Sequence, residues 1–266
     1  MSLIIETYLV LRRESDLTPA NPIIKEYRSN LARQIRLEYT PEEVEMVIRN
    51  KNIRELRQSL LVNLSESEYQ MELFESRRLC GESGAGLSAL AQYEDWEKYE
   101  SLVGHELEQL SKQPQPAEAG IPIVFVGSGP LPLSAILIHI LKKEIVYCLD
   151  IDPDACEAST ALLERIGLAH NIHVVKEDGA KFDYHPFQRI FIASLVPDKQ
   201  KVLEQIRRTR PDALVAVRTV EGMRQLMYEA LSEETMESEG WELLARTSPE
   251  GSTVINSTLF YRFKNY

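Results

Sequence analysis

The sequence contains few cysteines, and none of them is spaced as a metal or redox site. Cys80, Cys148 and Cys156 are the only three cysteines in 266 residues, and no two have the spacing of zinc ligands or of a redox pair. An odd number of cysteines without a disulfide framework predicts reduced thiols with structural roles and a cytoplasmic location. The five histidines are scattered along the chain, which argues against a histidine-rich metal site.

Basic residues are also scarce relative to acidic ones. The chain has 30 Lys and Arg against 41 Asp and Glu, a net charge of -11, and it contains no block of five like charges. Such a surface repels phosphate backbones and anionic lipids, so neither nucleic acid nor a membrane surface is an expected partner.

Targeting and membrane-spanning segments are not expected either. The first apolar stretch contains Glu6 and runs into Arg12 without a small-residue cleavage site, which argues against a signal peptide. The longest apolar stretch, residues 121–141, holds two glycines, three prolines and His139. It therefore predicts a strand, a turn and a helix rather than a membrane span.

The first part of the chain has a helical pattern. Thr40-Pro41-Glu42-Glu43 combines an N-cap hydroxyl, a proline at the first helical position and acids in the first turn, which predicts a helix start. Two further helices are predicted from Ile53 to about Cys80 and from about Tyr93 to Leu110, separated by a glycine-rich loop at residues 81–86. The expected apolar stripe of the first of these comprises Leu56, Leu60, Leu64, Met71 and Phe74.

After a polar, proline-containing linker at residues 111–120, the pattern changes to alternating strands and helices. We therefore predict a helical domain at residues 1–117, followed at 118–266 by a Rossmann-like, doubly wound, mostly parallel sheet with an antiparallel edge. The predicted strands are 123–126, 145–149, 172–175, 189–193, 213–217, 241–245 and 259–263, with helices at 135–141, 155–166 and 199–208.

The turn after the first strand has the composition of a nucleotide-binding loop. Gly127, Ser128 and Gly129 let the backbone approach a ligand closely, and the helix that follows supplies free amide donors. A dinucleotide fingerprint would require glycine at position 132, where this chain has Pro132, so NAD is disfavoured. Pro130 and Leu131 complete the predicted loop.

Carboxylates follow the next two strands. Asp150, with Ile151, stands at the tip of the second strand, where a ribose diol binds in this class of fold. Its alternative role is a helix cap, for which Asp152 is the better candidate. Asp178 and Gly179 follow the third strand, as an acceptor for the adenine amine or as a plain turn. These positions predict an adenosine site without phosphate, suited to the cationic sulfonium of S-adenosylmethionine. Ala193 and Ser194, at the end of the fourth strand, complete the set.

The run from Gly127 to Leu133, Gly-Ser-Gly-Pro-Leu-Pro-Leu, resembles the glycine-rich loop of nicotianamine synthases. The resemblance extends through the C-terminal half. It includes Asp150-Ile151-Asp152-Pro153, Val217-Arg218-Thr219, Gly222-Met223-Arg224 and Asn256-Ser257. It implies an α/β fold whose sheet is of the class I methyltransferase type.

The helical half is similar to the bacterial opine-metallophore branch of that family, the staphylopine and pseudopaline synthases. The points of similarity are Glu72, the run from Ser76 to Leu79, the glycine-rich loop at residues 81–86, and residues 93–99. Plant members carry a Pro-Tyr-Tyr-x-x-Tyr patch, of which this chain keeps only the last residue, Tyr99.

The resemblance implies transfer of the 3-amino-3-carboxypropyl (aminobutyrate) group of S-adenosylmethionine to an amine, with release of 5'-methylthioadenosine. The expected acceptor is an amino acid, histidine in the metallophore branch. S-adenosylmethionine is then a co-substrate, and no metal is expected because the sulfonium already provides a leaving group. The oligomeric state, including a homodimer, is left open.

Two carboxylates are candidates for the base that takes the amine proton. Glu68 and Glu72 lie on one helical face, where like charges raise each other's pKa. By resemblance Glu72 is the base and Glu68 the fallback, whereas spacing alone favours a solvated acidic face. Tyr99 is expected to orient the amine or the base, or else to be a core tyrosine.

Four polar residues are expected to bind the substrate, and Tyr99 is one of them. Arg218 is predicted to bind a carboxylate, with an ion pair as its alternative role. Arg78 and Asn256 complete the substrate set by resemblance. Three other functions remain open: a nicotianamine synthase proper, an S-adenosylmethionine-dependent methyltransferase, and a non-catalytic sensor of an adenosine ligand. Each of them would also use the glycine loop. For Glu68 and Glu72, the solvated acidic face described above remains open as well.

Overall fold

The computed structural model describes residues 1–82, 86–113, 120–249 and 254–264. The chain divides into two compact units, the first formed by Met1–Phe74 with Thr219–Leu231 and the second by Glu75–Arg218 with Ser232–Tyr266. The predicted linker and the predicted glycine-rich loop include residues 114–119 and 83–85, which lie outside the described residues. The domain boundary expected between residues 117 and 118 stays a prediction.

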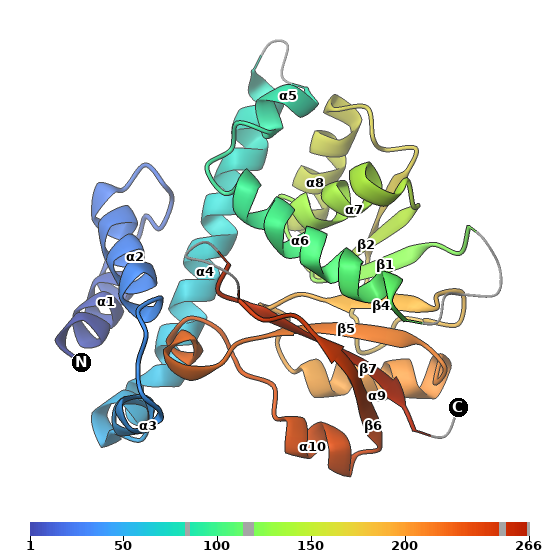
Figure 1. Cartoon of the computed structure of the whole chain (residues 1–266). Helices are drawn as coiled ribbons and strands as arrows, with labels where there is room; N and C mark the ends of the chain where they lie inside the picture. Colours follow the sequence, from blue (N-terminus) through green and yellow to red (C-terminus); the bar gives the residue numbers. More distant parts are fainter. Residues whose placement is uncertain (83–85, 114–119, 250–253, 265–266) are drawn as a thin grey trace. The chain divides into compact units, whose positions relative to one another are not determined.

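The first unit is helical (Figure 1). It contains α1 (Ser2–Arg13), α2 (Pro22–Ile35), α3 (Pro41–Ile48), most of α4 (Lys51–Gly81) and the 3-10 helix η1 (Gly222–Leu226). Its core includes aliphatic side chains that recur at helical spacing, with Leu17 added from the turn after α1: Ile4, Leu11, Leu17, Ile24, Leu31, Ile35, Ile53, Leu60 and Leu64.

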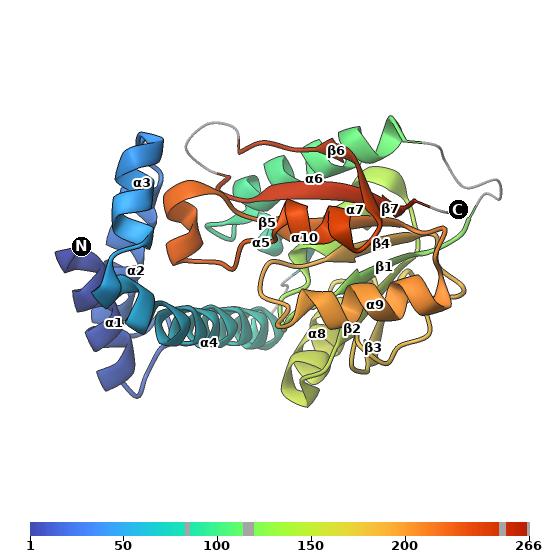
Figure 2. The ribbon, with the colours of Figure 1, turned by 90° about the horizontal axis from the view of Figure 1, so that it is seen from below.

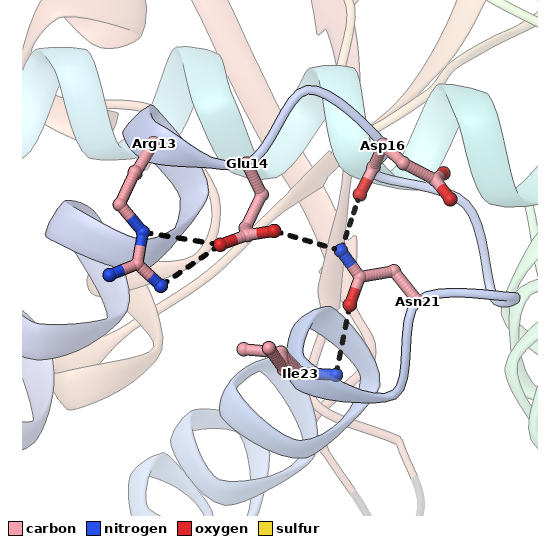
Figure 3. A network of polar contacts seen from close by, with 5 residues as sticks. All are labelled: Arg13, Glu14, Asp16, Asn21 and Ile23. Carbon is pink, nitrogen blue, oxygen red and sulfur yellow. Dashed lines mark hydrogen bonds and ion pairs between the residues drawn. The ribbon is translucent and has the colours of Figure 1, made fainter.

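The turn between α1 and α2 is held by the side chain of Asn21 (Figure 3). Its Oδ1 accepts a hydrogen bond from the backbone N–H of Ile23 at 3.0 Å, which caps α2. Its Nδ2 donates to the carbonyl of Asp16 at 2.9 Å and to the carboxylate of Glu14 at 3.3 Å. Glu14 also pairs with Arg13 at 3.0 Å, so a single network joins the end of α1 to the start of α2.

The helix start predicted at Thr40 is confirmed. The Thr40 hydroxyl accepts from the N–H of Glu43, and the Glu43 carboxylate accepts from the N–H of Thr40, so both halves of a capping box are present. The preceding α1 and α2 fall within the part of the chain for which only a general helical character was predicted.

Helix α4 confirms the predicted long helix but corrects its apolar stripe. Leu60 and Leu64 are buried, whereas Phe74 is 38% exposed. Ser76 is buried instead, and its hydroxyl donates to the carbonyl of Ala158 at 3.2 Å. At about 100° per residue, Ser76 lies on a different side of the helix from Leu60, so the buried face changes along α4. A single stripe could not have predicted this change, because residues before and after Phe74 belong to different units.

The second unit contains a seven-stranded sheet with the order β3-β2-β1-β4-β5-β7-β6. The strands are β1 (Ile123–Val126), β2 (Val146–Asp150), β3 (Ile172–Lys176), β4 (Arg189–Ile192), β5 (Leu214–Thr219), β6 (Trp241–Arg246) and β7 (Ser257–Phe263). Strands β1 to β5 pair in parallel, and β6 pairs with β7 antiparallel. The doubly wound, mostly parallel sheet and its antiparallel edge are therefore confirmed.

Helices cover both faces of this sheet (Figures 1 and 2). Figure 1 shows α6 (Trp96–Ser111), α7 (Leu133–Lys142) and α8 (Pro153–Arg165) on one face and α9 (Lys199–Thr209) on the other. The short helices α5 (Leu87–Leu90) and α10 (Glu233–Ser238) complete the unit. No helix in the described part of the chain has the length and apolar composition needed to cross a membrane.

The strand order determines where a ligand binds. The chain leaves β1 in one direction to build β2 and β3, and it returns to the other side of β1 with β4. Loops at the carboxyl ends of β1 and β4 therefore diverge, and in open α/β sheets ligands bind in the crevice at such a switch point. Gly127 and Ala193 are the first residues after these two strands.

Candidate functional site

The loop after β1 is built for close backbone approach. Gly127 and Gly129 both adopt positive φ angles, 75° and 68°, which L side chains rarely adopt. A Cβ on Gly127 would also lie 2.4 Å from Cγ2 of Val196 and 3.4 Å from Cβ of Ala193. Gly127 is thus required both by its own backbone conformation and by the chain that follows β4.

Asp150 holds this loop in place. Its carboxylate accepts from the N–H of Gly129 at 2.8 Å and, through the other oxygen, from the N–H of Asp152 at 3.0 Å. Burial raises the pKa of Asp150, although these backbone hydrogen bonds act in the opposite direction. The cap of α8 is Asp152, which accepts from the N–H of Ala155 at 2.8 Å. The helix-cap role considered for Asp150 therefore belongs to its neighbour.

These residues fit an adenosine moiety. A carboxylate has about four acceptor sites, so Asp150 keeps capacity for two hydroxyl donors such as those of a ribose. Ile151 exposes 64% of its surface next to it and offers an apolar face. The Ser128 hydroxyl is buried beside the Cys148 thiol, where it acts to lower the pKa of Cys148 against the larger effect of burial, so it is a polar group inside the loop.

Buried side chains hold the loop that follows β3 in place. Tyr184, whose pKa is raised by burial, donates from its hydroxyl to the carbonyl of Gly179 at 2.8 Å. A Cβ on Gly179 would lie 2.9 Å from Cγ1 of Val126, so this loop packs directly on the end of β1. Asp178 accepts from the N–H of Ala180 at 2.9 Å, which makes it part of a turn. Its predicted role as an adenine acceptor stays a prediction.

Two predicted residues that flank different strands meet here, since Ser194 follows β4 and Asn256 precedes β7. Asn256 Nδ2 donates to the Ser194 hydroxyl at 2.7 Å, and Asn256 is buried. Lys199 Nζ donates to the carbonyl of Ser194 at 2.9 Å and is buried as well. Ser194 is therefore held through both its side chain and its backbone, directly after Ala193.

Arg218 forms a buried ion pair. Its Nε and Nη2 donate to the two carboxylate oxygens of Glu106 at 2.8 and 2.9 Å. The Thr258 hydroxyl donates to the same carboxylate at 2.6 Å, and the guanidinium carbon lies 5.1 Å from the ring centre of Phe125. This geometry matches the ion-pair alternative, and the substrate-binding role of Arg218 stays a prediction.

The two other candidates in this unit lie on helices. Arg78 pairs with Glu75 at 2.8 Å and with Glu82 at 2.5 Å, and the hydrogen bond to Glu75 is the main cause of its raised pKa. Tyr99 is partly buried and packs against the hydrophobic core, while Lys98 Nζ lies 5.5 Å from the centre of its ring. Tyr99 therefore has the packing of the core-tyrosine alternative, which leaves its predicted role untested.

Both base candidates belong to the helical unit. Glu68 accepts from the Tyr228 hydroxyl at 3.0 and 3.2 Å and forms an ion pair with Arg28 at 3.5 Å. Glu72 is partly buried and follows one turn later on α4. The assignment of Glu72 as base and Glu68 as fallback stays a prediction.

Four residues that contact predicted ones were not identified from the sequence: Arg28, Glu106, Lys199 and Tyr228. Glu106 lies 112 residues before Arg218, and Tyr228 lies 160 residues after Glu68, so no local pattern links the partners. Lys199 could have been noticed as a basic residue directly after a strand-end turn. Over the described ranges, no three His, Cys, Asp or Glu residues gather as a metal-ion site.

The strand order, the positive-φ glycine loop and the carboxylate at the tip of β2 define the second unit as a Rossmann-like fold of the class I methyltransferase type. The whole chain can be assigned more narrowly. Residues 2–266 match the family model described as "Nicotianamine synthase protein", and the chain belongs to this family. Its members are S-adenosylmethionine-dependent aminocarboxypropyl transferases, and the chain is an enzyme of this type, with S-adenosylmethionine as co-substrate.

Similar proteins come from plants and bacteria. Probable nicotianamine synthase 4 of Arabidopsis thaliana is 29% identical over 226 residues, covering 80% of this chain and 68% of that protein. The L-histidine 2-aminobutanoyltransferase of Pseudomonas aeruginosa (strain UCBPP-PA14) is 34% identical over 133 residues, covering 48% of this chain and 49% of that protein. The solved structure of MtNAS in complex with MTA and tNA has a TM-score of 0.82 at 20% identity, covering 98% and 97% of the two chains. The last likeness establishes the common fold.

Proposed function

We propose that the chain transfers one 3-amino-3-carboxypropyl group from S-adenosylmethionine to the amine of histidine, as a step toward an opine-type metallophore. The observation that carries this proposal is the 34% identity over 133 residues to an L-histidine 2-aminobutanoyltransferase. Loss of most of the tyrosine patch expected in plant members, with Tyr99 retained, supports the same branch.

The proposed reaction is a single displacement. The nitrogen lone pair of the acceptor forms a bond to the terminal side-chain carbon of the aminocarboxypropyl group, and the carbon–sulfur bond breaks. Its electron pair stays on sulfur, which becomes the neutral thioether of 5'-methylthioadenosine. The protein must exclude water, align the nitrogen with the carbon and accept one proton from the acceptor's ammonium, which frees the lone pair for attack; the secondary amine that forms keeps its charge as an ammonium.

Residues of the second unit are proposed to bind the donor. Asp150 accepts the ribose hydroxyls, and the backbone of Gly127–Gly129, with the Ser128 hydroxyl, lies against the methionine end. Pro130 and Leu131 shape the loop, and Ile151 covers one face of the adenine. Asp178 and Gly179 receive the adenine edge, while Ala193 and Ser194 line the end of β4, where the proposed substrate residue Asn256 donates to Ser194.

Four residues on helices and Arg218 of β5 are proposed to act on the acceptor and on the group transferred to it. Glu72 takes the proton from the amine, with Glu68 as the fallback, and Tyr99 orients the amine. Arg78 and Arg218 are the proposed ligands for the carboxylate of the transferred group. To act in this way, Arg218 has to exchange part of its hydrogen bonding with Glu106 for the ligand.

Nicotianamine synthase itself is the second candidate. It is favoured by the longer alignment to the Arabidopsis thaliana protein, which covers 80% of this chain, against 48% for the histidine transferase. A nicotianamine synthase joins aminopropyl units to one another, so it needs no amino acid other than S-adenosylmethionine.

One assay separates these readings. The enzyme is incubated with S-adenosylmethionine alone and then with L-histidine or D-histidine, and products are identified by mass. We expect 5'-methylthioadenosine together with histidine carrying one aminobutyrate group. Nicotianamine from S-adenosylmethionine alone would establish the second candidate. S-adenosylhomocysteine would indicate a methyltransferase, and binding without any product would indicate a sensor.

A further inference from the structure

Three side chains from separate segments form a polar cluster inside the helical unit. Arg28 lies on α2, Glu68 on α4, and Tyr228 just after η1. Arg28 Nη2 lies 3.5 Å from the Glu68 carboxylate, which also accepts from the Tyr228 hydroxyl at 3.0 Å. The Arg28 and Glu68 side chains are 12% and 18% exposed, so the cluster is largely shielded but still reached by solvent.

Arg28 is firmly anchored at one end only. Its Nη1 donates to the carbonyl of Leu64 at 2.9 Å, which fixes the guanidinium against α4. Its Nη2 reaches Glu68 at 3.5 Å, an ion-pair distance that is longer than a normal N–H···O hydrogen bond. A guanidinium prefers two parallel hydrogen bonds to one carboxylate, and a ligand carboxylate could provide them.

We propose that Arg28 and Glu68 bind the α-carboxylate and the α-ammonium of an amino-acid acceptor, with Tyr228 orienting Glu68. A zwitterion brings one charge of each sign to a cation and an anion that already neutralise each other, so the partly buried cluster gains no net charge. A plain amine or a plain carboxylate would leave one shielded charge without compensation, which is costly. The cluster therefore selects α-amino acids over their decarboxylated amines.

This inference rests on the proposed function, because it supplies the acceptor site for that transfer. Residues four apart on a helix are neighbours on one face, so Glu72 follows Glu68 by one turn of α4. An ammonium held by Glu68 would lie on the helical face that carries the proposed base. The acceptor would then be oriented by Arg28 and Glu68 before Glu72 removes its proton.

The test compares L-histidine with histamine, which lacks only the carboxylate. Dissociation constants are measured by calorimetry, and kcat/KM is measured from methylthioadenosine release, for the unaltered enzyme and for Arg28→Gln. We expect the unaltered enzyme to prefer histidine at least about 10-fold, and Arg28→Gln to lose about 10- to 100-fold for histidine but little for histamine. The affinity for S-adenosylmethionine is expected to be unchanged, which also reports that the variant is folded.

Two further variants make the comparison specific. Arg36→Gln removes the same charge from an exposed position at the end of α2 and is expected to keep the preference for histidine. Tyr228→Phe is expected to raise the KM for histidine with a smaller effect on kcat, because it loosens Glu68 without removing its charge.

The outcomes separate this inference from the proposed function. No histidine binding by the unaltered enzyme, or an unchanged preference in Arg28→Gln, overturns the inference even if methylthioadenosine is formed. Arg28-dependent binding of histidine without any product supports the amino-acid site and overturns the proposed transfer instead.

Discussion

Arg218 of β5 and Glu106 of α6 form a bidentate ion pair in which both side chains are almost completely buried, at 6% and 0% exposure. The pair joins a helix on one face of the sheet to a central strand, and Thr258 of β7 donates to the same carboxylate. A charge in such a place is tolerated only while its partner is present.

Breaking this pair from one side should destabilise the enzyme strongly. We expect Glu106→Gln to lower the free energy of unfolding by about 3–5 kcal/mol, because Arg218 would remain buried without a compensating charge. The double variant Glu106→Leu/Arg218→Met should recover much of that loss. Denaturant unfolding followed by circular dichroism measures both effects. A stable Glu106→Gln variant with impaired histidine binding would instead favour the substrate-binding role of Arg218.

Gly127 should tolerate no side chain. We expect Gly127→Ala to abolish measurable binding of S-adenosylmethionine, because its φ of 75° is strained for alanine and its Cβ would clash with Val196. The double variant Gly127→Ala/Val196→Ala removes the clash but leaves the backbone strain, so it should regain only part of the affinity. Isothermal titration with S-adenosylmethionine checks this order.

Gly104 provides the matched control for that substitution. It lies inside α6, and a Cβ there would meet no atom within 4 Å. Gly104→Ala should therefore raise the free energy of unfolding by up to about 1 kcal/mol and leave donor binding unchanged. A loss of binding in this variant would show that the effect at Gly127 is not specific to the loop.

Donor affinity should fall in mild acid through Asp150. Its pKa is raised above the ordinary value of 3.8, chiefly by burial, and only the charged carboxylate accepts two ribose hydroxyls fully. We expect the dissociation constant of S-adenosylmethionine to increase as the pH falls through this raised pKa, and this dependence to be absent in Asp150→Asn. Equal pH dependence in both proteins would contradict the assignment.

The effect of Asp150 on folding has the opposite sign. Because its folded-state pKa is raised, its contribution to stability is fully present below the ordinary pKa of 3.8 and is lost as the pH rises through the folded value. Protonation of Asp150 in acid therefore weakens donor binding, and it also removes the free-energy cost of keeping a charged carboxylate buried in the folded protein. Thermal melting with and without S-adenosylmethionine over the same pH range distinguishes the two effects.

The proposed base can be tested with a substitution that removes its charge and keeps its size. Glu72→Gln should keep the affinity for S-adenosylmethionine and reduce methylthioadenosine release by about 10²- to 10⁴-fold, the usual contribution of a general base. Glu66→Gln, at an exposed position on the same helix, is the control and should retain activity. Full turnover in Glu72→Gln would eliminate it as the base and direct attention to Glu68.

The sheet could be predicted because short, nearly continuous apolar runs such as Ile123–Val126 are typical of buried parallel strands, and the glycine turn that follows is a local signal. The donor-binding residues could be predicted for the same reason, because in this fold they lie directly after the strands. Asn256 and Ser194 were both predicted, although their hydrogen bond joins residues 62 positions apart.

The errors and omissions arose where packing is not local. The stripe assigned to α4 assumed one buried face, whereas Ser76 and Leu60 are buried on different sides, so Phe74 was placed wrongly in the core. Arg28 and Tyr228 carry no local signal of their role, because each acquires its meaning from a partner distant in sequence. Such partnerships become visible only when the tertiary contacts are known.

The helical unit is discontinuous in sequence, since residues 219–231 return to it after the sheet has begun. Recombination at a single crossover point therefore cannot exchange this unit between relatives: a chimera that replaces residues 1–74 alone would combine Arg28 and Glu68 of one parent with Tyr228 of the other. Any natural or engineered change of acceptor that replaces the unit as a whole has to alter two separated stretches of the gene together.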